Sequence, residues 1–279
     1  MRCILAGAGL LSLSMLRFAA NLSMLYTEWP FLERYAQAAQ DGFAGVECLF
    51  PYAHPAEEVA AYLHDAGVQQ VLINAPPGDW AAGEKGLAGV PGQEAAFKRS
   101  IDTALHYAQQ LRCPTVHVMA GLVPQGLDRR RARACYVKNL AWAAAHVAAH
   151  ELTLTIEPIN PRDVPGYLLN HQAEAHDICA EVGAQNLRVQ MDFYHCQIVE
   201  GDLQTKLQRY VSNVAHMQIA GVPDRHEPIP CEIHYAHLFA AIEASGYCGW
   251  IGCEYHPRAG TRAGLDWIAP WLAAAPRAI

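Results

Sequence analysis

Four oxygen-bearing side chains interrupt otherwise apolar runs in the second half of the chain. They are Glu157 in TLTIEPIN, Asp192 in LRVQMDFYH, Gln218 in VAHMQIAG and Glu254 in GWIGCEYHP. A buried carboxylate needs a partner, because an isolated charge is very costly to remove from water. Carboxylates that point together repel one another unless a cation neutralises them, and all-oxygen ligands favour Mg²⁺ or Mn²⁺ over zinc. The pattern indicates one divalent metal site; the alternative is that a loop donor or an arginine satisfies each side chain separately.

Further polar side chains are candidates for binding a substrate beside such a metal. His195 follows Asp192 by three residues, so it could join the metal ligands, contact a substrate or support a ligand from behind. Arg225 offers a planar fork that suits a substrate carboxylate. Structural roles are the alternative for the histidines. The candidates are His117 in TVHVMAG, Glu47 in GVECLF, His195, and Arg225 and His226 in VPDRHEPIP.

The segments that carry these residues belong to a regular alternation of short apolar runs and longer amphipathic stretches. Nearly continuous β-branched and aromatic runs are typical of strands buried on both faces, whereas apolar residues three and four apart indicate helices. The predicted strands cover residues 18–24, 45–50, 70–75, 115–121, 153–160, 187–195, 214–221 and 249–257. The predicted helices cover residues 29–40, 55–66, 91–112, 128–150, 170–183, 201–211, 231–245 and 262–273.

This alternation predicts an α/β chain that folds as a (β/α)8 barrel, because eight strand–helix units are the number such a barrel needs. A doubly wound open sheet is the alternative, but the GxGxxG turn that normally follows its first strand is missing. No linker or charge block divides the chain, so we expect one domain over residues 17–279. The metal-ligand candidates then come from four consecutive strands and converge on one side of the barrel mouth.

Two long connections rich in Gly and Pro follow the third and seventh predicted strands, at residues 76–92 and 222–230. Loops at this end of the strands build the active site of a barrel, so we expect both connections to border it. The first could act as a lid that excludes water. An ordinary surface loop is the alternative.

Composition restricts the partners and the compartment. The formal net charge of −7 lacks the basic footprint of a nucleic-acid-binding protein. Nine cysteines without a CxxC pair do not support a zinc–cysteine site and are typical of reduced cytoplasmic thiols. Residues 1–16 have one early charge and no clear cleavage site, so we interpret them as an N-terminal extension outside the fold, with a weak export signal as the alternative. We expect a cytoplasmic protein without a membrane partner; a homo-oligomer is compatible with the sequence.

On these residues the chain resembles the hydroxypyruvate isomerase family of xylose-isomerase-like TIM barrels, which includes the closely related 2-oxo-tetronate isomerases. The resemblance runs from Arg17 to about Trp267. Two residues depart from the family pattern: His256 stands where lysine is usual, and His234 changes EINY to EIHY. The segments that carry the resemblance are RFAANLSMLYTEWPF, GVECLFPY, PPGDWAAGEKGLAGVPG, IEPIN, MDFYHCQ, HMQIAGVPDRHEP, EIHY and GWIGCEY.

The resemblance implies that Glu157, Asp192, Gln218 and Glu254 hold Mg²⁺ or Mn²⁺, and that Glu157 and Glu254 are the acid/base pair. It implies an aldose–ketose isomerase that interconverts hydroxypyruvate and 2-hydroxy-3-oxopropanoate (tartronate semialdehyde) through a metal-stabilised enediolate. The alternative substrate is 2-oxo-tetronate, because RFAANLSM, VHVMAGLVP and QIAGVPDRHEP look more like those enzymes. A ketose 3-epimerase and a non-catalytic sugar-acid-binding barrel are further alternatives. An apurinic-endonuclease-like phosphodiesterase would need more metal-binding histidines and a basic face.

Overall fold

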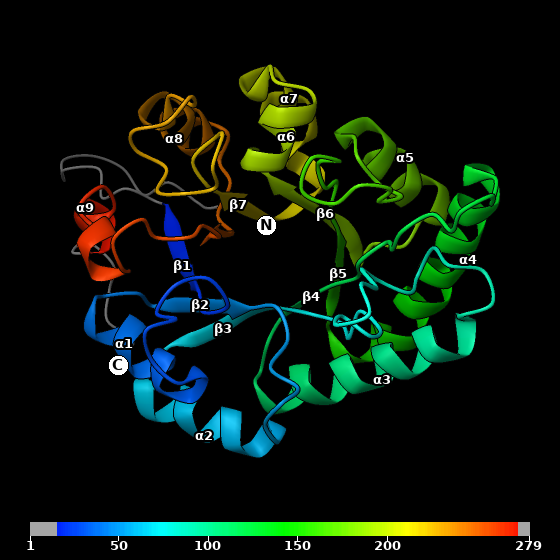
Figure 1. Cartoon of the computed structure of the whole chain (residues 1–279), viewed down its shortest axis with the longest axis horizontal. Helices are drawn as coiled ribbons and strands as arrows, with labels where there is room; N and C mark the ends of the chain where they lie inside the picture. Colours follow the sequence, from blue (N-terminus) through cyan, green and yellow to red (C-terminus); the bar gives the residue numbers. More distant parts are fainter. Residues whose placement is uncertain (1–15, 273–279) are drawn as a thin grey trace.

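Parallel strands close into a barrel in the order of the sequence (Figure 1). The structure is a computed structural model that describes residues 16–272. The predicted (β/α)8 architecture is confirmed. The strands are β1 Arg17–Asn21, β2 Gly45–Cys48, β3 Gln69–Asn74, β4 Thr115–His117, β5 Thr153–Ile156, β6 Leu187–Asp192, β7 Val214–Ile219 and β8 Trp250–Cys253.

Helices connect successive strands and surround the barrel (Figure 1). The α-helices are α1 Arg34–Gln40, α2 Ala56–Ala66, α3 Glu94–Gln110, α4 Arg129–Val147, α5 Gln172–Val182, α6 Phe193–Val199, α7 Leu203–Tyr210, α8 Tyr235–Ala244 and α9 Ala269–Leu272. Short 3-10 helices are η1 Phe31–Glu33, η2 Ala148–His150, η3 Val211–Asn213 and η4 Arg262–Gly264.

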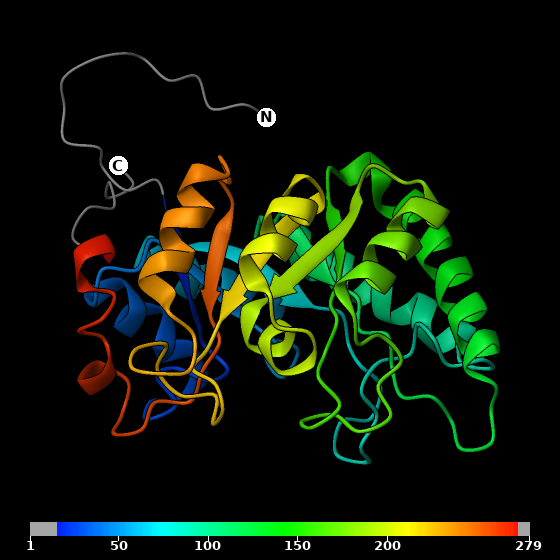
Figure 2. The same cartoon turned by 90° about the horizontal axis from the view of Figure 1, so that it is seen from above.

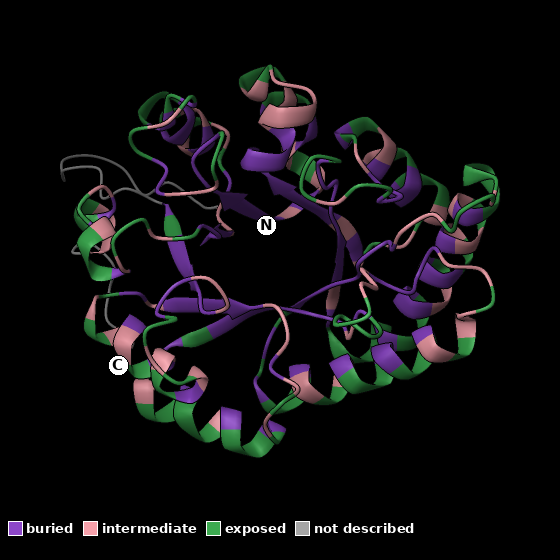
Figure 3. Cartoon of the chain, in the orientation of Figure 1, coloured by how far each residue is buried: buried purple, intermediate pink, exposed green. Residues whose placement is uncertain are grey.

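The barrel strands are buried on both faces, as their nearly continuous apolar sequences predict. All residues of β2, β4 and β8 are buried, and Figure 3 shows the strands buried inside a ring of helices whose outer faces are exposed. Val116 and Ile156 belong to the main apolar core, which also takes in the inner faces of the helices. The polar side chains of the strands therefore lie inside a largely apolar molecule.

Several elements differ from the sequence prediction. The strands expected at 115–121, 153–160 and 249–257 end earlier, at His117, Ile156 and Cys253, and the helix expected at 29–40 is divided into η1 and α1. The strand expected at 187–195 ends at Asp192, and residues 193–199 form α6 instead. The change has a local cause, because the Asp192 carboxylate accepts a hydrogen bond from the Tyr194 backbone N–H at 2.7 Å and so caps the new helix. The helix expected at 262–273 is divided into η4 and α9.

Strand register places polar residues of neighbouring strands at the same level of the barrel. In β6 and β7, Asp192 pairs with Gln218, and Gln218 in turn pairs with Gly252 of β8. In β1 and β2, Asn21 pairs with Glu47. Figure 2 shows the longer loops gathered on one side of the barrel, the side that the strand ends face.

The expected N-terminal extension lies almost wholly outside the described residues, which begin at Leu16. Leu16 is buried in the core directly before β1. Among residues 16–272, none of the helices has the length and apolar character that crossing a membrane requires.

Candidate active site

Three carboxylates and one imidazole converge where the barrel strands end. Glu157 and Glu254 directly follow β5 and β8, Asp192 ends β6, and His195 lies in the first turn of α6. One ligand atom from each of these four residues lies within 4.8 Å of the other three. All four residues are buried, the most accessible being Glu254 at 7%. This buried group can bind a metal ion.

Asp192 has two oxygen atoms with different tasks. Its Oδ1 accepts the hydrogen bond that caps α6, whereas Oδ2 has no hydrogen-bond partner although it is buried. The Glu157 Oε1 atom is also buried without a partner. Buried polar atoms are almost always hydrogen-bonded, so two unpartnered oxygens in one buried group of carboxylates indicate a place for a ligand.

The acidic group holds its protons more tightly than free carboxyls do. Burial raises the pKa of Glu157 well above its usual value, and the charges of Glu254 and Asp192 raise it further. Burial likewise raises the pKa of Asp192 to about 6 and that of Glu254 to about 8, against the lowering effect of Arg225. Carboxyls that titrate near neutral pH are suited to taking up and releasing protons.

Arg225 brings the positive charge nearest to these carboxylates. Its guanidinium donates to Glu254 Oε2 and lies 3.6 Å from Asp192 Oδ2 and 3.7 Å from Asp163 Oδ2. The Arg225 backbone is in the left-handed region at φ 58°, where the loop turns back toward β8. Although burial lowers the pKa of Arg225, the neighbouring carboxylates Glu254, Asp192 and Glu157 raise it above its usual value, so the residue is a permanent cation.

His195 presents a hydrogen-bond donor to the unpartnered oxygens. Its Nδ1 atom accepts from the Asn160 backbone N–H at 3.4 Å and lies 2.6 Å from the Asn160 side-chain nitrogen. Burial lowers the pKa of His195 well below its usual value, and the positive charge of Arg225 lowers it further, so the ring is neutral. The single proton is therefore on Nε2, which lies 3.6 Å from Asp192 Oδ2 and 3.9 Å from Glu157 Oε1. This tautomer suits hydrogen bonding to a substrate oxygen.

His117, at the end of β4, is the other candidate imidazole at the barrel mouth. It is 1% exposed, and neither ring nitrogen has a hydrogen-bond partner. Nδ1 lies 3.5 Å from Glu157 Oε2. Burial, followed by the nearby His216, lowers the pKa of His117 to about 3, so the ring is neutral and offers one donor and one acceptor.

Glu47 and Gln218 lie beside this group but are already hydrogen-bonded. Gln218 donates to Glu47 Oε1 at 2.7 Å, and its own amide oxygen accepts from Gln190 at 2.7 Å. Glu47 also accepts from Asn21 at 2.9 Å and lies 2.6 Å from His216 Nε2. An amide oxygen has a second lone pair, so metal ligation by Gln218 stays a prediction, as does substrate binding by Glu47.

The sequence analysis missed the neutral polar side chains that surround these residues. A usable signal was present, because His216 and Gln190 lie two residues before Gln218 and Asp192 on the same strands. Residues two apart on a strand share one face, so both point into the barrel with the residues that were singled out. Asn160 has no such signal, since it follows β5 in a loop.

His226, His256 and His234 lie at the edge of the site. His226 is half-buried and its Nδ1 lies 2.7 Å from the His256 carbonyl oxygen. His256 is exposed; burial, followed by Arg225 and His226, lowers its pKa. His234 caps α8 by accepting from the His237 backbone N–H at 3.1 Å. The EIHY departure thus keeps a helix cap, a role that asparagine also fills well.

Contacts between its own residues stabilise the connection at 76–92. Glu84 accepts from the Asp79 backbone N–H at 2.5 Å, and Lys85 Nζ lies 3.3 Å from the centre of the Trp80 ring. Trp80 is 42% exposed, and its ring centre lies 5.1 Å from that of Phe50 in the loop after β2. A lid function for this loop stays a prediction.

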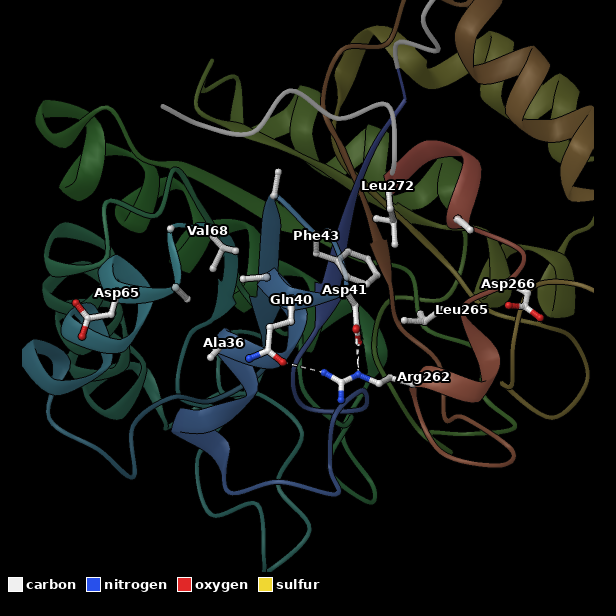
Figure 4. A pocket seen from close by; sticks show the side chains of 16 residues that line it. Ala36, Gln40, Asp41, Phe43, Asp65, Val68, Arg262, Leu265, Asp266 and Leu272 are labelled. Atoms are coloured by element: carbon white, nitrogen blue, oxygen red, sulfur yellow. Dashed lines mark hydrogen bonds and ion pairs between the residues drawn. The ribbon is translucent and has the colours of Figure 1, made fainter.

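A groove of about 1000 Å³ lies elsewhere on the molecule (Figure 4). Its walls come from α1, the segments that precede β2 and β3, and the region from η4 to α9, with Arg262 paired to Asp41. Segments that precede strands lie at the opposite end of a barrel from the catalytic loops. The groove therefore does not belong to the carboxylate site.

A divalent cation fits the donor set at the strand ends. The two unpartnered oxygens, Glu157 Oε1 and Asp192 Oδ2, belong to the same buried group as Glu254. Three carboxylates exceed the single charge of Arg225, and hard divalent cations prefer oxygen ligands. The charge balance and the missing hydrogen bonds are therefore both met by such an ion.

Known proteins resemble this chain over nearly its full length. Residues 35–271 match the family described as xylose isomerase-like TIM barrel. The chain is 58% identical to the 2-oxo-tetronate isomerase of Cupriavidus necator, covering 92% of this chain and 98% of the relative. It is 43% identical to the hydroxypyruvate isomerase of Escherichia coli, covering 92% of this chain and 100% of the relative.

A solved structure described as AP endonuclease, family 2, from Brucella melitensis superposes with a TM-score of 0.90 at 48% identity, covering 91% of this chain and 98% of that one. The eight-stranded barrel, the carboxylates at its strand ends and these relatives agree with one another. The chain therefore belongs to the xylose isomerase-like TIM barrel family, in the group whose members are named hydroxypyruvate isomerase and 2-oxo-tetronate isomerase.

Proposed function

We propose that this chain is an isomerase that moves a carbonyl group between C2 and C3 of a short hydroxy-2-oxo acid. The observation that carries the proposal is the buried group containing Glu157 and Glu254, two carboxyls with raised pKa beside unpartnered oxygen atoms. Relatives of 43% and 58% identity carry the names of such isomerases.

The two candidate substrates differ by one hydroxymethyl group. Hydroxypyruvate would give tartronate semialdehyde, and 2-oxo-tetronate would give its 3-oxo isomer by the same step. Hydroxypyruvate is supported by the name of the E. coli relative and by the DWAAGE and IEPIN segments. The second candidate, 2-oxo-tetronate, is favoured by the higher identity of 58% to the C. necator relative.

We assign the metal to Glu157, Asp192, Gln218 and Glu254, with Mg²⁺ or Mn²⁺ as the ion. When bound, such an ion acts as a Lewis acid that stabilises negative charge on the two substrate oxygens. The place suits a cation because Glu157 Oε1 and Asp192 Oδ2 are buried without a hydrogen-bond partner.

The protein groups supply the proton transfers. One glutamate removes the proton from C3 of the substrate, an enediolate forms, and the other glutamate delivers a proton to C2. The proton of the C3 hydroxyl passes to O2 in the same sequence, so that the carbonyl ends on C3 and a hydroxyl on C2. The neutral His195 donates through Nε2 to a substrate oxygen and favours the charge that develops there. Arg225 already donates to Glu254 through Nε and one terminal nitrogen, and it binds the substrate carboxylate through its remaining N–H groups. Each role belongs to an atom that faces the buried group.

Side-by-side kinetics with both substrates test the proposal. The wild-type protein should turn over at least one of them, and a chelator should abolish the rate until Mg²⁺ or Mn²⁺ is restored. Glu254→Gln should lower kcat strongly, whereas Glu181→Gln, at an exposed residue on α5, should not. Full activity of Glu254→Gln would remove this residue from the acid/base role. A chelator-insensitive rate in protein without metal would remove the metal.

Two rival activities can be assayed with the same purified protein. A ketose 3-epimerase would invert C3 of a ketose without moving the carbonyl. A nuclease, the activity for which the Brucella protein is named, would cleave DNA at an abasic site. We favour the isomerase, because the net charge is −7 and the metal-binding group in residues 16–272 includes one histidine only.

We also propose that the barrel works in the cytoplasm on a free small-molecule substrate, and that residues 1–15 are not needed for folding, because the core includes Leu16 but none of the described residues lies before it. The N-terminal part of this proposal is tested by a variant that begins at Leu16, which keeps that buried side chain. Its melting temperature and kcat should equal those of the full chain. A lower melting temperature would show that the preceding segment stabilises the fold.

A further inference from the structure

Asn21, the last residue of β1, connects two buried carboxylates. Its side-chain nitrogen donates to Glu254 Oε1 at 3.0 Å and to Glu47 Oε1 at 2.9 Å. Asn21 is 1% exposed, so water does not compete for these hydrogen bonds. One amide nitrogen has two protons, and here both have an acceptor.

The backbone fixes which end of the Asn21 amide faces the carboxylates. The Ser23 backbone N–H donates to Asn21 Oδ1 at 3.0 Å, in the turn that ends β1. With the oxygen held by this donor, the nitrogen must point toward Glu254 and Glu47. The side chain therefore has one orientation, set by the chain just beyond the strand.

Glu47 is an anchor with little freedom to move. Gln218 donates to its Oε1 at 2.7 Å, and His216 Nε2 lies 2.6 Å from its Oε2. The carboxylate also packs against β8, because a Cβ atom added to Gly252 would clash with both of its oxygens. Any residue larger than glycine at 252 would displace Glu47.

The consequence is an asymmetry between the two proposed acid/base residues. Both oxygens of Glu254 are held, Oε1 by Asn21 and Oε2 by Arg225, whereas Glu157 Oε1 has no partner. We propose that Asn21, anchored by Glu47, is a positioning residue that fixes the Glu254 carboxylate for proton transfer and metal binding. This inference rests on the proposed isomerase function.

An amide suits this task because it holds a carboxylate without adding charge. A cation at residue 21 would add a second positive charge beside Arg225 and compete with a metal for Glu254, whereas an acid would repel Glu254. Misplacing a reacting group by about 1 Å can lower a rate about 100-fold. Partners behind metal ligands change metal affinity or activity by about 10- to 100-fold when they are removed.

The test compares Asn21→Ala with Asn186→Ala. Asn186 is a matched control, because its side-chain nitrogen also donates to two acceptors, the backbone carbonyls of Ala144 at 2.9 Å and Leu152 at 3.4 Å. It precedes β6, so it lies at the other end of the barrel from Asn21. Asn21→Ala should lower kcat by about 10- to 100-fold and weaken Mn²⁺ binding, measured by calorimetry on the whole protein, by a similar factor. KM should change by less than about threefold, since the substitution removes no protein group that binds the substrate. The control should match the wild type in all three.

Proton exchange in deuterated water shows which glutamate is affected. Glu157→Gln and Glu254→Gln should each lose a different part of the exchange, at C3 or at C2 of the substrate. Asn21→Ala should reproduce the pattern of Glu254→Gln and not that of Glu157→Gln. A general loss of folding would lower both exchanges together.

Gly252→Ala provides an independent perturbation of the same network from β8. It should weaken Mn²⁺ binding and lower kcat, as Asn21→Ala does, although it replaces no polar side chain. If Asn21→Ala does not fold, Asn21→Ser and Gly252→Ala decide the question. Mn²⁺ affinity and kcat within about twofold of wild type in the variants that fold would overturn the role of Asn21. A wild type that binds Mn²⁺ but turns over neither substrate would overturn the proposed activity instead, while the Mn²⁺ comparison would still decide the role of Asn21.

Discussion

Glu47 and Glu157 are both buried glutamates that face the inside of one barrel, and their surroundings are opposite. Glu47 has no exposed surface, accepts from Asn21 and Gln218, and lies against His216. Glu157 is 4% exposed, its Oε1 has no partner, and Oε2 has only His117 at 3.5 Å. Burial is nearly equal, so burial does not distinguish them.

The difference lies in where the hydrogen-bond donors come from. Glu47 is within a strand and receives donors from β1 and β7 that the barrel itself holds in place. Glu157 follows its strand, where loops replace the barrel wall and leave one oxygen atom for a ligand. A buried carboxylate with a complete set of donors supports the fold, whereas one with a missing donor is prepared to bind and react.

The largest expected effect is on catalysis at Glu157. Glu157→Gln should lower kcat by about 1000-fold, which is about 4 kcal/mol, because general acid/base groups contribute on this scale. The free energy of unfolding of the metal-free protein should not fall, since the substitution removes a buried carboxyl that lacks a full set of hydrogen-bond partners. Denaturant titration and steady-state kinetics measure the two quantities. A destabilised variant would contradict the contrast with Glu47.

Glu47→Ala should have the next largest effect, and it should be on stability. The substitution leaves the donors of Asn21, Gln218 and His216 without their acceptor inside the barrel. Each unsatisfied buried donor costs about 1–3 kcal/mol, so for three donors we expect a loss of about 3–9 kcal/mol in the free energy of unfolding. An unchanged denaturation midpoint would show that Glu47 is not the anchor that its contacts indicate.

The pH dependence of stability should reveal the raised pKa values of Glu254 and Asp192. The pKa of Glu254 rises from 4.5 to about 8 on folding, and that of Asp192 from 3.8 to about 6. The folded protein then binds more protons than the unfolded chain, so their contribution is complete below about pH 4 and is lost as pH rises toward about 8. The melting temperature of chelated wild type minus that of Glu254→Gln should therefore fall between about pH 5 and about pH 8.5.

Metal should reverse this trend, because its carboxylate ligands must be deprotonated. Mn²⁺ should raise the melting temperature of the wild type more at about pH 8.5 than at about pH 5, by shifting the folding equilibrium. An equal rise at both pH values would contradict ligation by these carboxyls.

His117 should show a smaller effect, confined to substrate binding. Neither of its ring nitrogens has a protein partner, so His117→Ala should not lose an internal hydrogen bond. We expect KM to rise about tenfold, the equivalent of one hydrogen bond to substrate of about 1.4 kcal/mol, with a smaller change in kcat. A fall in kcat with KM unchanged would place His117 in the proton transfer instead.

The smallest effect should come from His226, at the edge of the site. Its Nδ1 lies against the His256 carbonyl oxygen at 2.7 Å and it is only half-buried. His226→Ala should change kcat and KM by less than about threefold, because surface polar contacts contribute little. A tenfold rise in KM would restore His226 as a substrate ligand.

The sequence was sufficient for the barrel and for the placement of Glu157, Asp192 and Glu254 together at its strand ends. Alternating apolar segments determine the number of strands, and a charge inside such a run is visible without a structure. The same reasoning extended the sixth strand to residue 195, because the apolar run continues through Phe193 and Tyr194. The helix that begins there depends on one side-chain hydrogen bond, which composition does not reveal.

The contact between Asn21 and Glu47 was beyond prediction for a different reason. Asn21 and Glu47 lie far apart in sequence, and they meet because β1 and β2 pair in one particular register. Hydrogen-bond orientation, as in the Asn21 amide and the His195 ring, needs atomic positions. A sequence therefore identifies the charges of a site more readily than the neutral groups that hold them.

The shared role of Asp192 has an evolutionary consequence. One side chain ends a strand, caps a helix through Oδ1 and offers Oδ2 to a ligand. Asparagine would keep the cap, since it serves that role as well as aspartate does, but it would remove the negative charge. Catalytic function could therefore be lost in a descendant by a single conservative exchange that leaves the architecture intact, and asparagine at this position would mark paralogues that have kept the barrel for another purpose.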